Sequence, residues 1–239
     1  LALYYLLMSR LSNSEDITVG TPVSGRELKD VEQMNGMFVN TLPLRTQVDY
    51  GQTFADFVKQ TGQDVFACLD NQAYPFEELL EELKIERDAS RNPLFDTMFS
   101  YQRVEEYSAK LDSLEVRQAS AMPAVEQFDL SMIAGEDVDG MVITLQYATA
   151  LFTQETINRF GKYFLQIVQS AVSNPNSKLV DIRMLPEEEE SALLAQLTGP
   201  VLSIPKHQTM VGLFEDSVKA NSNGIALVFH EEELTYKAL

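Results

Sequence analysis

The chain has 239 residues, with 18 Lys and Arg against 36 Asp and Glu, and a formal net charge of −18. This length corresponds to one or two domains, and 45% hydrophobic residues suit a folded core. The negative charge argues against nucleic acid or an anionic membrane as the main partner, because both repel an acidic surface.

Cys68 is the only cysteine, which excludes an internal disulfide framework and any metal site built from several cysteines. It falls on the apolar stripe of a predicted helix, which favours packing over nucleophilic chemistry. The apolar opening, Leu1 to Met8, is too short to span a bilayer. These features favour a cytoplasmic protein without a membrane anchor.

The first and last residues of the sequence both fall within predicted secondary-structure elements. Leu1 already falls inside an apolar helical pattern, and Leu234 to Leu239 resemble an element that is just beginning. We therefore expect this sequence to be an excerpt from a longer protein.

The first quarter of the chain predicts a helix followed by two strands. Apolar residues recur at helical spacing over residues 1–12, and an extended run follows from Ile17 to Val23. A second extended run covers Met37 to Val48, where Pro43 is typical of an edge strand.

Two amphipathic helices are predicted next. Thr53 is placed to cap a helix whose apolar residues from Phe54 to Cys68 recur every three or four positions. Pro75 stands where a second helix would start. The predicted buried stripe of that helix is Phe76, Leu79, Leu80 and Leu83.

From Asp96 the pattern changes to short strands and a long helix. Strands are predicted at residues 97–101, 114–116, 128–133 and 141–147. The last two form a hairpin around an acidic turn at residues 135–140. Thr153 would then cap a long helix that ends at Asn174 and Pro175. Helices and strands mix without strict alternation, which predicts an α/β or α+β fold.

The end of the chain differs from the rest. Pro186 opens a short helix, and later prolines interrupt the chain, so residues 186–207 are interpreted as a linker between residues 1–185 and residues 208–239. The last segment holds one helical and one strand pattern, too little for an independent core. We expect it to be the start of another domain.

The sequence does not contain a complete active site. Its two histidines, His207 and His230, lack a plausible set of catalytic neighbours and are interpreted as surface residues. No metal-binding spacing, nucleophile elbow, Walker loop or dinucleotide fingerprint is present. Neither a metal nor a bound cofactor is predicted.

Four strings of glycine, proline and polar residues stand out between the apolar runs. Turn and cap chemistry accounts for many of their residues individually. The strings are residues 20–26 (GTPVSGR), 34–45 (MNGMFVNTLPLR), 71–77 (NQAYPFE) and 87–95 (RDASRNPLF).

In this order and spacing, the strings resemble the second half of a condensation domain from a nonribosomal peptide synthetase. The resemblance covers about residues 1–185 and extends to Phe128-Asp129-Leu130, although Ser131 follows there. Residues 208–239 resemble the opening of an adenylation domain, with Lys237-Ala238-Leu239 departing from the usual final string.

The resemblance implies the fold of chloramphenicol acetyltransferase, in which two α/β halves form a V around a tunnel. This chain looks like one half, the C-terminal subdomain, with a mixed sheet packed against helices. The catalytic string HHxxxDG belongs to the other half and is missing here. We therefore expect the isolated chain to be inactive.

The family's reaction joins two thioester-linked substrates that carrier proteins deliver on phosphopantetheine, and an amide bond forms. Orientation in the tunnel supplies much of the rate, and the second histidine positions or deprotonates the amine. The implied partners are peptidyl carrier proteins, the N-terminal condensation subdomain and the adenylation domain.

Two residues are candidates for supporting that chemistry. Arg26 is implied to pair with the aspartate of HHxxxDG, and its alternative is a surface arginine at a strand end. Asn40 is a polar residue in an apolar string and requires a partner. It would orient a loop or line the channel, and a purely structural use is the alternative.

A charged cluster precedes Pro93 and is interpreted as mainly structural. It consists of Arg87, Asp88, Arg91 and Asn92, and we expect it to form an ion-paired loop that fixes the strand after Asp96. Other members of the superfamily, the heterocyclisation and epimerisation domains, remain alternatives, as does a non-catalytic module that docks carrier proteins.

Overall fold

The computed structural model describes residues 1–85, 91–103, 126–137, 140–199 and 209–239. The chain divides into two compact units, Leu1–Glu190 and Ser191–Leu239. The predicted strand at residues 114–116 lies outside the described residues.

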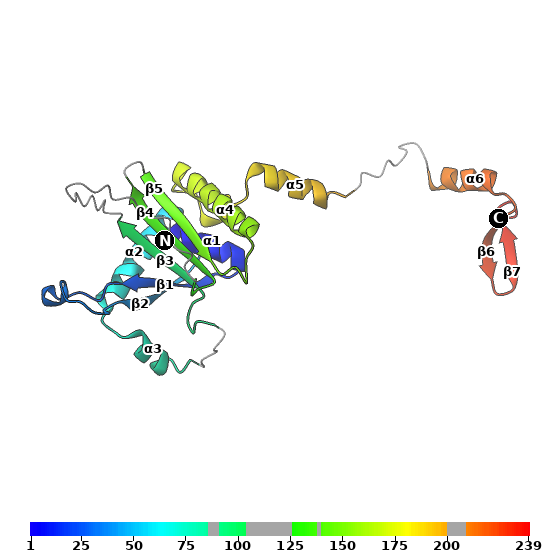
Figure 1. The fold of residues 1–239 in the computed structure, drawn as a ribbon. Coiled ribbons are helices and arrows are strands. Elements are labelled where there is room, and N and C mark those ends of the chain that lie inside the picture. The colour runs from blue at the N-terminus through cyan, green and yellow to red at the C-terminus, as the bar shows by residue number, and fades with distance from the viewer. Residues whose placement is uncertain (86–90, 104–125, 138–139, 200–208) are drawn as a thin grey trace, which may run out of the picture. The chain divides into compact units, whose positions relative to one another are not determined.

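The first unit is built on a five-stranded mixed sheet (Figure 1). Its order is β2 (Asn40–Gln47), β1 (Asp16–Val23), β3 (Thr97–Arg103), β4 (Leu130–Asp137) and β5 (Gly140–Tyr147). The pairs β2/β1 and β4/β5 are antiparallel, whereas β1/β3 and β3/β4 are parallel. The parallel pairs join strands that are distant in sequence, as in a mixed α/β fold.

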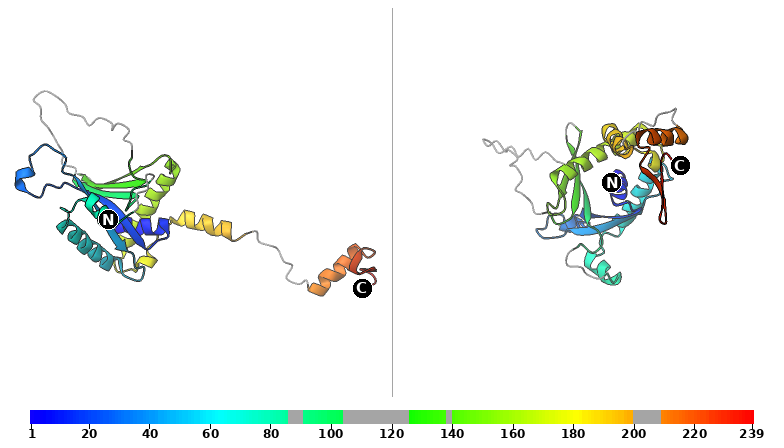
Figure 2. Two further views of the ribbon diagram at one scale, coloured as in Figure 1. Left: turned by 90° about the horizontal axis from the view of Figure 1, so that it is seen from below. Right: turned by 90° about the vertical axis from the view of Figure 1, so that its right-hand side faces the viewer.

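Three helices cover one face of the sheet. The central helix is α1 (Ala2–Ser12), which contacts β1, α2 (Phe54–Asp70) and α4 (Gln154–Ser173). In the right-hand view of Figure 2 the strands lie on one side of α1, which carries the N-terminus, and α2 and α4 flank it. Tyr4, Leu6 and Leu7 of α1 are fully buried. The apolar opening of the sequence is therefore the centre of the core.

The predicted starts of the two long helices are confirmed. Thr53 Oγ1 accepts a hydrogen bond from the backbone N–H of Asp56, and Thr153 Oγ1 accepts one from Thr156. Each threonine satisfies a backbone donor that has no partner within its helix. The edge position predicted from Pro43 is also confirmed, since β2 is the first strand of the sheet.

The strand predicted from Met37 begins later, at Asn40, because residues 37–39 belong to the preceding loop. The β4/β5 hairpin is confirmed, but its predicted turn at 135–140 was too wide. Strand β4 continues to Asp137, which pairs with Gly140.

The buried stripe predicted after Pro75 is confirmed only in part, since Phe76 and Leu79 are half-buried and Leu83 is exposed. Helix α3 spans only Phe76–Glu82, and Leu80 is its one buried residue. Leu83 stands after the helix and is 53% exposed. A continuing helix would return to the same face seven residues after Phe76, but α3 ends at Glu82, so the periodicity does not extend to Leu83.

The second unit contains α6 (Met210–Ala220) and a hairpin of β6 (Ile225–Phe229) and β7 (Glu232–Thr235). Thr209 caps α6 through the N–H of Gly212, and His230 occupies the turn of the hairpin with φ 55°. None of the described residues of these elements is buried. Helix α5 (Glu187–Leu197) begins directly after Pro186, as predicted.

No helix among the described residues is both long and apolar enough to cross a membrane. The same ranges contain no group of three or more His, Cys, Asp or Glu side chains that is able to hold a metal ion.

Candidate functional site

The sheet face opposite the three helices carries a mixture of polar and apolar side chains. The register aligns Met98 with Ser131 and Ser131 with Gln146, and the exposed Gln102, Val142 and Thr144 stand on the same face. Because side chains alternate along a strand, the neighbouring residues, such as Met132 of β4, point into the core under α1. The first unit thus has one closed face and one face that remains accessible.

A loop of residues 24–39, here called the 24–39 loop, joins β1 to β2 and contains a short 3-10 turn at Lys29–Val31. In Figure 1 it projects beyond the ends of these two strands. Arg26 lies within it, and its guanidinium donates to backbone carbonyls of the same loop. Asp and Glu side chains are absent from these contacts.

Asn40 connects the string at residues 34–45 to the string at residues 71–77. Its Nδ2 donates to the carbonyl oxygens of Gln72 and Tyr74, both at 2.9 Å. These carbonyls belong to the turn that precedes α3, so one amide of β2 fixes the shape of that turn. These contacts are those of a side chain that orients a loop.

Aromatic rings connect the remaining strings. Phe95 contacts Phe76 on one side and Phe128 on the other, with ring centroids 5.8 Å apart in each pair. A Cβ added at Gly20 would lie 2.2 Å from Phe95 Cε2. The Phe95 ring therefore packs against β1 because Gly20 has no side chain. Residues that are up to about a hundred positions apart in sequence form one packed cluster.

The charged cluster is described only in part. Arg91 forms an ion pair with Asp96, the residue before β3, through Nε and Nη2. Asn92 Nδ2 donates to the carbonyl of Gln127 at 3.4 Å. Arg87 and Asp88 lie outside the described residues. An exposed pair of this kind contributes about 1 kcal/mol or less.

Among the residues that the structure describes, the side chains with nucleophilic or acid-base chemistry are not assembled into a site. Cys68 is half-buried against the core, and burial raises the pKa of its thiol, which keeps it protonated. His230 is exposed and its ring contacts Phe229. His207 lies outside the described residues.

Asn40 and Cys68 lie near an apolar hollow at the edge of the sheet. It measures about 270 Å³ between β2, the end of α2 and α3. Its walls are Thr41, Leu42, Pro43, Cys68, Asn71, Tyr74, Phe76 and Leu79. The turn that Asn40 holds forms one of these walls, through Asn71 and Tyr74.

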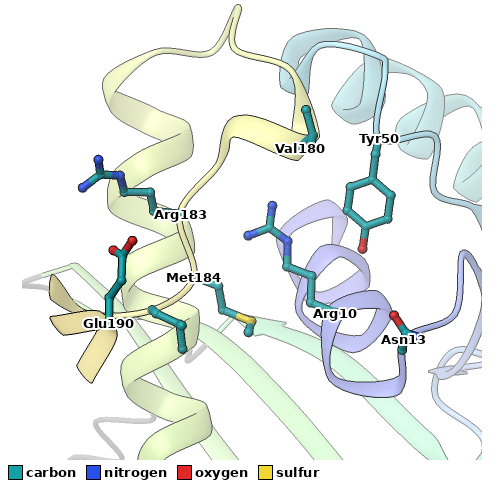
Figure 3. A pocket seen from close by; sticks show the side chains of 8 residues that line it. Arg10, Asn13, Tyr50, Val180, Arg183, Met184 and Glu190 are labelled. Carbon is teal, nitrogen blue, oxygen red and sulfur yellow. The ribbon is translucent and has the colours of Figure 1, made fainter. Parts of the chain in front are cut away.

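A larger hollow of about 550 Å³ lies on the helical side (Figure 3). Arg10 of α1 reaches across it and donates to the carbonyls of Leu179, at 2.6 Å, and Ile182. Its guanidinium also lies 6.0 Å from the ring centre of Tyr50. Burial lowers the pKa of Arg10, and Tyr50 opposes that shift. Sequence reasoning missed this residue, although an arginine within an apolar helix was a usable signal.

The comparisons with known proteins agree with this arrangement. The sequence model of the condensation domain family matches residues 1–194, so the chain belongs to that family. The confirmed fold is the mixed α/β fold of condensation domains, with a mixed sheet packed against helices.

Among its relatives, gramicidin S synthase 2 of Brevibacillus brevis is 43% identical over 241 residues, and tyrocidine synthase 3 of Brevibacillus parabrevis is 40% identical. Both matches cover all of this chain, but only 5% and 4% of these relatives' lengths.

Solved structures share the fold at low identity. Holo-AB3403, a four-domain nonribosomal peptide synthetase bound to AMP and glycine, matches with TM-score 0.76 and 21% identity, over 99% of this chain and 19% of its own. The condensation domain of the Monacolin K polyketide synthase MokA matches with TM-score 0.66 and 24% identity, over 74% of this chain and 41% of its own.

Replacing Asn40 with alanine is expected to lower the free energy of unfolding by about 2 kcal/mol, because two carbonyls lose their shared donor. Urea unfolding followed by circular dichroism measures this change. Asn92→Ala is the matched control, since its single bond is long and exposed, and we expect a change of less than about 0.5 kcal/mol. Equal effects of the two changes would contradict the role given to Asn40.

Proposed function

We propose that the chain is the C-terminal half of an amide-forming condensation domain, followed by the start of an adenylation domain. One observation carries the proposal: both histidines of the chain, His207 and His230, stand after residue 194, where the family match ends. The matched region therefore contains family structure without the family's catalytic base.

In this proposal the half contributes a wall of the reaction tunnel. The sheet face opposite the helices would line the space that two extended thioester-linked substrates occupy. The cluster of Asn40, Phe76, Phe95 and Phe128 keeps that wall rigid, which serves a reaction that depends on orientation. Arg26 would couple the wall to the aspartate of HHxxxDG in the other half.

The assignment of the last segment follows from the same proposal. The relatives align over the whole chain, beyond the region that the condensation family model matches. The described part of residues 208–239 has exposed apolar side chains, among them Val228 and Phe229, as expected of a domain's opening without its remainder. We place the linker at residues 186–207.

The proposed partners are peptidyl carrier proteins, which bring phosphopantetheine-linked substrates, together with the N-terminal subdomain and the adenylation domain. The chain itself would bind no cofactor. Its setting would be cytoplasmic biosynthesis of a peptide antibiotic.

Joining this chain to a first half that carries HHxxxDG is expected to restore amide formation. Donor and acceptor carrier proteins loaded with aminoacyl thioesters are mixed with the joined domain, and mass spectrometry follows the acceptor. We expect a dipeptidyl thioester with the joined domain, none with the chain alone, and none when the second histidine of HHxxxDG is alanine.

The products separate the alternatives. Loss of one further water indicates heterocyclisation, and inversion of a stereocentre without a new amide indicates epimerisation. Amide formation by the isolated chain, or carrier binding by a joined domain that never reacts, would overturn the proposal.

A further inference from the structure

Three buried side-chain atoms have no hydrogen-bond partner within the described ranges of the chain. They are Thr46 Oγ1 of β2, Thr61 Oγ1 of α2 and Gln52 Nε2. Thr46 and Thr61 are only 4% and 6% exposed. Buried hydroxyls are nearly always hydrogen-bonded in folded proteins, because the loss of their bonds to solvent costs free energy that only another partner offsets. The two threonines therefore require an explanation.

Both threonines line the same internal pocket. It lies between α1, β2 and α2, which also contribute Tyr5, Leu44 and Cys68 to its walls. Its volume is about 10 Å³. A buried water molecule requires a space of about 10–15 Å³. The pocket therefore matches one water molecule and is too small for a larger ligand.

The threonine hydroxyls do not use the partners that are nearest in sequence. A threonine inside a helix is able to donate to the carbonyl four residues earlier, which for Thr61 is the carbonyl of Phe57. Within the described ranges Thr61 makes no such bond, and the hydroxyls of Thr46 and Thr61 do not bond to each other. Two hydroxyls from different elements thus share a pocket of the size of a water molecule.

Tyr5 adds a third hydroxyl to the walls of this pocket. Its phenol donates to the carbonyl of Leu44 at 3.0 Å, and its oxygen retains lone pairs that are able to accept a bond. Burial raises the pKa of Tyr5, and the nearby Cys68 and Asp64 raise it further. Asp64 also lines the pocket. These groups meet the roughly two to four polar partners that a buried water molecule requires.

We propose that this pocket binds one structural water molecule, which bridges Thr46 of β2 and Thr61 of α2. The bridge would join the two elements that lead to the turn held by Asn40, since β2 begins at Asn40 and α2 ends just before Gln72. The water molecule would thereby complete the polar contacts between the edge strand and its covering helix. This inference does not depend on the proposed function.

NMR relaxation dispersion of the water oxygen nucleus tests the proposal on the full chain, because it counts water molecules that stay bound for longer than the protein takes to tumble. The double variant Thr46→Val with Thr61→Val replaces both hydroxyls with methyl groups of similar size. We expect it to hold one bound water molecule fewer than the wild type. Thr61→Ser keeps the hydroxyl and should retain the wild-type number. Unaltered far-UV circular dichroism shows that each variant folds.

Urea unfolding adds a test that depends on the sign of the effect. With a bridging water molecule, each single valine variant lowers the urea midpoint, and the double variant loses less than the sum because either change already weakens the bridge. Without one, each valine removes a hydroxyl that has no partner and raises the midpoint. Thr144→Val, at an exposed position of β5, is the control and should shift the midpoint little. Raised midpoints in both single variants, or an unchanged number of bound water molecules in the double variant, overturn the proposal.

Discussion

Replacing Gly20 with valine is expected to lower the free energy of unfolding by about 3 kcal/mol. A Cβ at this position would lie 2.2 Å from Phe95 Cε2 and 2.6 Å from Met98 Sδ. The methionine is flexible, but the Phe95 ring is 5% exposed and is held between Phe76 and Phe128. To admit the Cβ, either the ring must leave its contacts with Phe76 and Phe128 or β1 and β3 must separate. Urea unfolding followed by circular dichroism measures the loss.

A second glycine provides the control for this prediction. Gly62 lies inside α2, and a Cβ there would meet no atom within 4 Å. Gly62→Ala is therefore expected to stabilise the chain by about 0.5–1 kcal/mol, through helix propensity and reduced freedom of the unfolded chain. The sign of the effect should differ between the two sites.

A compensating change identifies the Phe95 ring as the cause. Gly20→Ala should destabilise less in combination with Phe95→Leu than the sum of the two single changes, because the smaller side chain makes room for the Cβ. Strict additivity would show that the ring is not the obstacle. Such a result would also contradict the inference that Phe95 packs against β1 at Gly20.

Local patterns were sufficient to predict most of the secondary structure. Thr53 and Thr153 were recognised as caps because a cap depends only on residues within one turn. The stripe that included Leu83 failed because periodicity does not indicate where a short helix ends. Which residues of α3 are buried depends on its packing against β2, about thirty residues earlier in the chain.

The contacts of the candidate site depend on tertiary structure, so sequence alone did not predict them. Asn40 was recognised as a polar residue that requires a partner, but its partners are the carbonyls of Gln72 and Tyr74. Every residue has a backbone carbonyl, so the identity of a residue does not indicate whether its carbonyl accepts a side-chain hydrogen bond. For the same reason, the attachment of Arg26 to its own loop was not predicted from the string that contains it.

Replacing Arg10 with methionine is expected to lower the free energy of unfolding by about 3 kcal/mol. Methionine preserves the apolar stem but leaves the carbonyls of Leu179 and Ile182 without their donor, at a cost of about 1–3 kcal/mol each. Leu179 and Ile182 are themselves almost fully buried, at 0% and 2% exposure.

The loss should be concentrated in the segment that follows α4. That segment is also held by Leu179 N–H to the Gln52 carbonyl, at 2.9 Å, and by Val180 N–H to the Tyr50 carbonyl, at 3.1 Å. These backbone bonds remain in the variant, so we expect faster hydrogen exchange over residues 179–186 and an unchanged sheet.

Arg183→Met is the matched control for Arg10→Met. Arg183 lines the same hollow, but it is exposed and points away from Arg10 (Figure 3). Within the described ranges, its guanidinium has no ion pair at 4.0 Å or less, and a change within about 0.5 kcal/mol is expected. Equal losses of stability in the two variants would indicate that removing any positive charge from this acidic chain is the cause. A loss confined to Arg10→Met instead assigns it to the bonds that hold the segment after α4.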